Sequence, residues 1–118
     1  MTGLKSIIQR YFEGESIMEK IRKKEVREWI ADAIKPRTSA IITHAVVEDD
    51  NDVALTVISE GATTIKSERY TFRKQGNLLS AVLYTAIIIN KNDKSVLMTD
   101  YRQMNGLFTR DEFDALVK

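Results

Sequence analysis

The sequence contains no cysteine, and this absence excludes disulfide bonds, thiol nucleophiles and cysteine-ligated zinc. It has a single proline and five glycines, all where turns are expected, so no proline-rich or glycine-rich linker divides the chain. No apolar run reaches the ~20 residues that a membrane-spanning helix needs. The first residues, MTGLKSII, are amphipathic and lack an apolar core of signal-peptide length. We therefore expect a cytoplasmic protein with no membrane partner.

An excess of charge of one sign is also missing. Eighteen basic and seventeen acidic residues give a formal net charge of +1, which argues against a strong field for nucleic acid. One histidine with scattered carboxylates does not supply the convergent ligands of a metal site, so we expect no metal and no other cofactor. With 118 residues, 43% of them hydrophobic, the chain fits a single domain over residues 1–118.

The longest uncharged stretch is LLSAVLYTAIII, residues 78–89. Its β-branched and aromatic residues favour a strand over a helix. Because both faces of this strand would be apolar, we expect it in the middle of a sheet, with helices over one face and a further layer or a second subunit over the other. Strict alternation predicts one face with Leu78, Val82, Tyr84, Ala86 and Ile88, and another with Leu79, Ala81, Leu83, Thr85, Ile87 and Ile89.

Two helices are predicted before the sheet. Helical spacing of apolar residues predicts the first over residues 3–13. A capping box formed by Ser16 and Glu19 predicts that the second begins at about Ile17, and Pro36 predicts its end at Ile34 or Lys35.

The second predicted helix has two apolar groups that point in different directions. They are Ile17, Met18 and Ile21, and then Val26, Trp29, Ile30, Ala33 and Ile34. Either the helix bends or breaks near residues 22–25, or it buries one group and offers the other to a partner. The candidate partner-binding residues on its basic side are Lys20, Lys23, Lys24 and Arg27. The alternative is a solvated face with local ion pairs such as Glu19 to Lys23.

From residue 38 onward the hydrophobic period changes to two. Strands are predicted over residues 38–47, 53–59, 64–74, 78–89 and 95–103, joined by short hairpin turns. A second capping box, Thr109 with Glu112, predicts a helix over residues 110–117, with Phe108 and Phe113 as a hydrophobic staple. The predicted fold class is α+β, with two N-terminal helices packed on a five-stranded antiparallel meander sheet and a short C-terminal helix.

This element order resembles the NTF2-like superfamily of cystatin-like α+β folds. The local likeness lies in VVEDDNDVALTVISEG and ERYTFRKQGNLLSAVLYT, which are similar to the long paired strands of that family. The ending NGLFTRDEFDAL is similar to a short C-terminal helical module found after many bacterial domains. The chain departs from the family in its fifth strand, its C-terminal helix and the lack of a third helix before the sheet. The resemblance implies a cavity between helices and sheet, used by some relatives for catalysis and by others for binding.

The candidate pocket residues are Phe12, Trp29, His44, Tyr70 and Tyr84. Glu68, Asp100 and Tyr101 are the other titratable residues considered on strands, and we interpret Asp100 as one partner of an edge-strand ion pair. No catalytic residue is singled out, because no second residue at fixed spacing supports the lone histidine.

Three functions are open at this point. The leading prediction is a non-catalytic protein-interaction or regulatory module acting through a helix face or a sheet face. It includes a homodimer through a sheet face with Ile42, Val46, Leu55, Val57 and Leu83. The alternative is an NTF2-like pocket protein that binds a small ligand or acts as an isomerase or hydrolase. The third is a weak nucleic-acid binder through the basic helix, and the low net charge argues against it.

Overall fold

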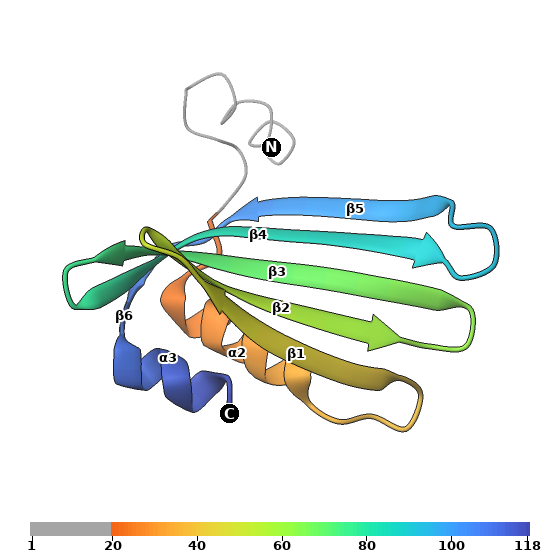
Figure 1. Cartoon of the computed structure of the whole chain (residues 1–118), viewed down its shortest axis with the longest axis horizontal. Coiled ribbons are helices and arrows are strands. Elements are labelled where there is room, and N and C mark those ends of the chain that lie inside the picture. The colour runs from red at the N-terminus through yellow and green to blue at the C-terminus, as the bar shows by residue number, and fades with distance from the viewer. Residues whose placement is uncertain (1–19) are drawn as a thin grey trace, which may run out of the picture.

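The computed structural model describes residues 20–118, and both helices that it contains lie on one side of a single antiparallel sheet (Figure 1). The elements are α2 (Lys23–Ile34), β1 (Ile41–Glu48), β2 (Asp52–Glu60), β3 (Thr64–Gln75), β4 (Leu78–Asn90), β5 (Val96–Gln103), β6 (Leu107–Thr109) and α3 (Arg110–Leu116). The predicted helix over residues 3–13 and the capping box at Ser16 lie outside the described residues.

The sheet runs in the order β1-β2-β3-β4-β5, with every neighbouring pair antiparallel. The α+β class and the five-stranded antiparallel meander are thus confirmed. A sixth strand, β6, is not among the predicted strands and pairs with the first residues of β4. Its three residues are too few to show an alternating pattern.

Strand β4 lies where the sequence predicts it, but its side chains do not alternate strictly. Thr71 of β3 pairs with Leu83, whereas Phe72 pairs with Ala81, so Val82 is an extra residue in a β-bulge. Because of the bulge, the odd-numbered Leu79 and Ala81 are buried before Val82, and the even-numbered Tyr84 and Ala86 are buried after it. The predicted face assignment is therefore wrong before Val82.

Helix α2 begins at Lys23, later than the predicted start at about Ile17, and residues 20–22 are not helical. Ile21 is 3% exposed and makes an isolated parallel bridge with Met104. At the helix start the backbone N–H of Arg22 donates to the Glu25 carboxylate at 2.9 Å. The predicted continuous helix from residue 17 to residue 34 is thus wrong, because residues 20–22 are not helical, and residues 17–19 lie outside the described part of the chain. The predicted end at Ile34 is confirmed.

The core lies between the helices and one face of the sheet. Helix α2 buries Val26, Ile30 and Ala33 there. Phe72 is at its centre, with edge-to-face contacts to Phe108 at 5.6 Å and Phe113 at 5.1 Å between ring centroids. Pairs of this kind contribute about 0.5–1.5 kcal/mol each beyond the area that they bury.

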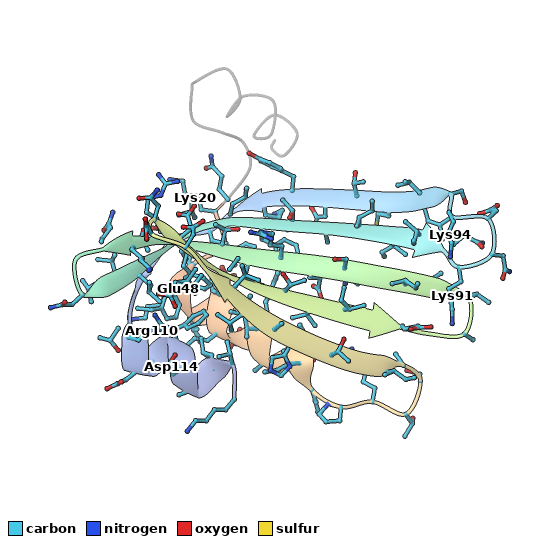
Figure 2. The ribbon with its side chains drawn as sticks, viewed as in Figure 1. Lys20, Glu48, Lys91, Lys94, Arg110 and Asp114 are labelled. Atoms are coloured by element: carbon cyan, nitrogen blue, oxygen red, sulfur yellow. The ribbon has the colours of Figure 1, made fainter. Side chains whose placement is uncertain are left out.

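Helix α3 is fixed by its cap and by one ion pair to β1. Thr109 Oγ1 accepts from the Glu112 N–H at 3.1 Å and the Glu112 carboxylate accepts from the Thr109 N–H at 2.8 Å, which confirms the predicted capping box. Figure 2 shows Arg110 close to Glu48 and Asp114, with nitrogen-to-oxygen distances of 3.0 and 3.1 Å. Hydrogen bonds from Arg110 and then Lys74 lower the pKa of Glu48 to about 2.

The second face of the sheet has no described element over it, and we call it the open face. Its larger apolar residues are Ile41, Val47, Ile58, Ile65, Leu83, Ile87, Ile89 and Tyr101. Within residues 20–118 the chain covers only one face of β4, since Ile87 on the open face is 37% exposed. The expected layer or second subunit over the open face stays a prediction.

The residues predicted for a dimer face do not share one face. Leu55 and Val57 are 0% exposed and belong to the core, because the register pairs Leu55 with the buried Tyr70. Leu83 lies on the open face instead. Neither α2 nor α3 has the length and apolar character to cross a bilayer.

Candidate functional site

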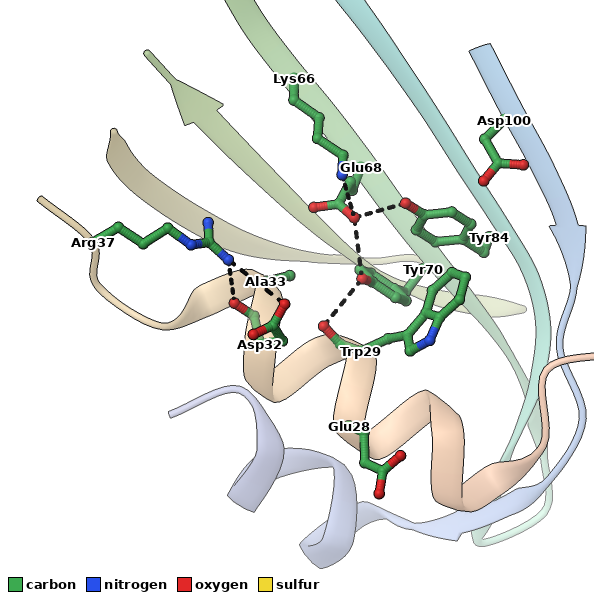
Figure 3. Close-up of a pocket in the computed structure, with 10 residues that line it drawn as sticks. All are labelled: Glu28, Trp29, Asp32, Ala33, Arg37, Lys66, Glu68, Tyr70, Tyr84 and Asp100. Atoms are coloured by element: carbon green, nitrogen blue, oxygen red, sulfur yellow. Dashed lines mark hydrogen bonds and ion pairs between the residues drawn. The ribbon is translucent and has the colours of Figure 1, made fainter. Parts of the chain in front are cut away.

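A pocket of about 600 Å³, open to solvent, lies between the C-terminal half of α2 and the core face of β3, β4 and β5 (Figure 3). Its lining combines aromatic and charged side chains. The residues are Glu28, Trp29, Asp32, Ala33, Arg37, Lys66, Glu68, Tyr70, Tyr84 and Asp100.

The helical part of the pocket follows from side-chain spacing on α2. Trp29, Asp32 and Ala33 are three and four residues apart, so they lie on one helix face. Arg37 lies after the C-terminus of α2, and its side chain folds back onto the helix. Its guanidinium donates to the backbone carbonyl of Asp32 at 2.6 Å and lies 3.8 Å from the carboxylate of the same residue.

The sheet part of the pocket consists of two neighbouring rows of side chains. In one row the register places Tyr70 beside Tyr84. In the next row Glu68, Ala86 and Asp100 lie side by side on β3, β4 and β5. Because residues paired in this way point to the same face, the two carboxylates flank the small Ala86 side chain.

Glu68 is the one charged residue among residues 20–118 that is buried, with 8% exposure. Its Oε2 accepts a 2.7 Å hydrogen bond from the Tyr84 hydroxyl, and the Tyr70 hydroxyl lies 3.4 Å away. The ammonium of Lys66 is 3.7 Å from the same oxygen. Two hydroxyl donors and one ammonium ion pair converge on Oε2, so this atom acts as a fixed acceptor.

The second oxygen of Glu68 faces the pocket. Within the described part of the chain, no buried side-chain oxygen or nitrogen lacks a hydrogen-bond partner. The hydrogen bonds and ion pairs of Glu68 there reach Oε2 only. Oε1 therefore keeps accessible surface, has no hydrogen-bond donor within residues 20–118, and can accept a hydrogen bond from a ligand.

Three aromatic rings form the apolar wall. Trp29 meets Tyr84 edge to face at 5.0 Å, and Tyr70 lies 5.0 Å from Tyr84 at a tilted angle. Arg102 places its guanidinium 5.5 Å from the centre of the Trp29 ring. This distance is typical of a cation–π contact.

Both phenols of the pocket keep their protons at neutral pH. Burial raises the pKa of Tyr70 well above its usual value, and the charge of Glu68 raises it further. Burial also raises the pKa of Tyr84, with its hydrogen bond to Glu68 as the next cause. The two hydroxyls are therefore donors. Tyr84 donates to the Glu68 carboxylate, and the Tyr70 hydroxyl lies 3.4 Å from the same carboxylate and 3.5 Å from the backbone carbonyl oxygen of Trp29.

The structure brings together three of the five candidate pocket residues, Trp29, Tyr70 and Tyr84. His44 is not among the lining residues, and its Nε2 lies 2.9 Å from the backbone carbonyl oxygen of Val117. Phe12 lies outside the described residues.

Glu68 and Asp100 line the pocket but are not among the five candidate pocket residues. The signal for Glu68 was its even spacing from Tyr70 and Phe72, which places it on the same face. The expected edge-strand ion pair of Asp100 is wrong, because within residues 20–118 its carboxylate makes no ion pair and accepts from the Tyr101 backbone N–H at 2.8 Å.

The four basic partner-binding candidates do not form one free patch. Lys23 and Arg27 contact the Glu112 carboxylate at 3.2 and 2.7 Å, and both lie over the Phe108 ring. Lys20 and Lys24 are exposed. Half of the predicted surface therefore joins α2 to α3.

The pocket residues do not form a metal site, since residues 20–118 contain no group of three or more histidine, aspartate or glutamate side chains placed to hold an ion. Comparisons with known proteins add no assignment: no family model, no curated protein and no solved structure matches the chain. The likeness to the NTF2-like superfamily stays a prediction from element order and strand pattern.

Proposed function

We propose that this protein binds a small molecule in the pocket between α2 and the sheet. The observation that carries the proposal is the buried Glu68 carboxylate, held by Tyr84 at 2.7 Å beside an open space of about 600 Å³. Burying a charged group is unfavourable unless it is paired and hydrogen-bonded. An apolar residue would pack the site without that cost, so a recognition role explains the carboxylate better than packing does.

The role is binding rather than catalysis. Neither phenol is a base at neutral pH, because the raised pKa values of Tyr70 and Tyr84 keep both protonated. Glu68 is engaged as an acceptor by both of them. The only histidine of the chain is bonded to the backbone away from the lining.

The test is an NMR titration of the ¹⁵N-labelled chain with mixtures of small cyclic fragments. Trp29 is the only tryptophan, so its indole N–H gives one resolved reporter in the pocket wall. We expect the largest shift changes at this indole and at the backbone amides of Glu68, Tyr84 and Asp100. The proposal fails if no fragment at millimolar concentration shifts these signals, or if the shifts cluster on the open face.

A second candidate function is self-association through the open face. Ile41, Val47 and Tyr101 there are 69%, 56% and 61% exposed. Exposed apolar patches of this kind mark interaction sites. Five strands about 4.8 Å apart and about ten residues long present roughly 800 Å². This area is close to the ~800 Å² per partner of a standard interface, and we assign the face to a second copy of the chain.

Sedimentation equilibrium tests this second candidate. We expect a dimer of the 13.5 kDa chain at high micromolar concentration, dissociated by Tyr101→Lys. Met98→Lys is the matched control, since Met98 is 46% exposed and its register places it on the opposite face. A monomer at that concentration, or equal effects of the two substitutions, would reject the dimer.

The basic residues give less support to a helix-mediated or nucleic-acid interface. Lys23 and Arg27 are paired with Glu112, Arg73 with Asp52 and Lys74 with Glu48. Paired side chains would have to break these contacts to bind phosphates.

A further inference from the structure

We propose that the ligand of the pocket is an organic cation, a protonated primary or secondary amine carried on a flat apolar group. This inference rests on the proposed binding function and adds the chemical class of the ligand. It follows from the charges, from the two carboxylates that flank Ala86 and from the aromatic wall.

The charges that line the pocket favour a cation. Four of the lining residues are acidic and two are basic, which gives a formal charge of −2. The two basic residues already have carboxylates nearby, Arg37 at 3.8 Å from Asp32 and Lys66 at 3.7 Å from Glu68. Asp100 makes no ion pair within the described part of the chain. A cleft that has a low dielectric constant and is lined by an excess of negative charge attracts positively charged ligands.

The two carboxylates next to Ala86 provide the binding position. Glu68 and Asp100 lie one strand away on either side of Ala86, so their backbones are separated by about 10 Å, two strand spacings. Both side chains line the pocket, and Figure 3 shows them on the same side of the sheet. Figure 3 shows the Tyr84 hydroxyl between the two carboxylates, bonded to Oε2 of Glu68. An ammonium beside Asp100 therefore donates to the Asp100 carboxylate, and the accessible Oε1 of Glu68 is a separate acceptor for a second donor of the ligand; hydrogen bonds from an ammonium to either carboxylate are charge-assisted.

The aromatic wall accommodates the rest of the ligand. Trp29 and Tyr84 supply ring surface next to the carboxylates. The guanidinium of Arg102 over Trp29 shows that this ring already faces one cation. Aromatic faces attract ammonium groups in the same way.

An anionic ligand fits the site poorly. It would have to displace Glu68 from Lys66, or Asp32 from Arg37, while four carboxylates repel it. A neutral ligand would contact the aromatic wall but would leave the charge of Asp100 without compensation.

Three ligands of the same shape and different charge test the class. Benzylamine, benzyl alcohol and benzoate are titrated separately, with the Trp29 indole N–H signal as the readout. We expect benzylamine to bind at least tenfold more tightly than the alcohol, and benzoate not to bind. If the alcohol or benzoate binds as well as benzylamine, the cation class is wrong and the pocket function stands. If none of the three shifts the pocket signals and the fragment mixtures do not either, both proposals fail.

A pair of substitutions assigns the effect to the carboxylate. Asp100→Asn should weaken benzylamine binding about tenfold, because a charged acceptor is lost. Asp50→Asn makes the same charge change in the exposed β1–β2 turn, outside the pocket lining, and should leave the affinity unchanged. Unchanged affinity in the Asp100 variant, or equal losses in both variants, would overturn the assignment.

Discussion

The Tyr84 hydroxyl donates a 2.7 Å hydrogen bond to Glu68, although the residue paired with Tyr84 across the sheet is Tyr70. The contact is diagonal, from one row of side chains to the next, and such neighbours are within reach of aromatic side chains. The Tyr84 hydroxyl therefore provides a hydrogen-bond donor for a carboxylate that is buried and has little contact with water.

Replacing Tyr84 by phenylalanine should therefore destabilise the protein. Removing one partner of a buried charged acceptor costs about 1–3 kcal/mol. Urea denaturation measures the change in the free energy of unfolding. Tyr101→Phe is the control, measured at low micromolar concentration where the proposed dimer is dissociated, because Tyr101 is 61% exposed in the single chain and should change stability by less than about 0.5 kcal/mol. Equal effects of the two substitutions would show that the Glu68 contact adds no stability.

Stability should fall at alkaline pH. The folded-state pKa values of Tyr70 and Tyr84 are raised, so their protons are held more tightly in the folded chain than in the unfolded chain. This contribution is complete below the ordinary tyrosine pKa of about 10 and is lost as the pH rises above it, because the unfolded chain ionises first.

Chemical denaturation between pH 8 and 11.5 measures this loss. The Tyr84→Phe variant should lose less stability than the unchanged chain over the same range, since one of the two groups is gone. The same loss in both proteins would contradict the assignment of the raised pKa to Tyr84.

The contact of α3 with β1 should weaken in acid. Arg110 and Lys74 lower the pKa of Glu48 to about 2, so its contribution is present above the unfolded value of 4.5 and is lost as the pH falls toward 2. Glu48→Gln should raise the amide hydrogen-exchange rates of residues 110–116 at pH 6. Asp50→Asn, in the neighbouring turn, should leave them unchanged. Equal exchange in the Glu48 variant and the unchanged chain would contradict the role of this ion pair.

Gly106 should not tolerate a side chain. Its φ is +134°, and an added Cβ would lie 2.6 Å from Cβ and 3.0 Å from Cα of Lys23, at the start of α2. Gly106→Ala should therefore destabilise by about 1–3 kcal/mol, because the strand connection and the helix must move apart. Gly61→Ala is the matched control, since its Cβ would meet only ordinary contacts at 3.7 Å or more. Thermal melts that shift equally would refute the close approach.

Much of the fold could be predicted from local signals. The apolar run at residues 78–89 defines β4, and Thr109 with Glu112 defines the start of α3. The bulge at Val82 could not be predicted, because no glycine or proline marks it and it arises where the partner of β4 changes from β6 to β5. The start of α2 at Lys23 likewise depends on the tertiary bridge between Ile21 and Met104.

The pocket was only partly predictable. Tyr70 and Tyr84 are large aromatic residues on predicted strands, and Trp29 is on a predicted helix, so the sequence indicated the aromatic wall of the pocket. The carboxylates depend on cross-strand register, which aligns Glu68 with Asp100 across Ala86 from positions 32 residues apart. No local pattern in one strand contains that information.

The most direct test of the binding function is a crystal structure grown with the fragment that shifts the Trp29 indole signal most. We expect ligand density against the Trp29 and Tyr84 rings, with a donor group of the ligand within hydrogen-bond distance of Oε1 of Glu68. Density on the open face, with the pocket filled by its own side chains, would contradict it.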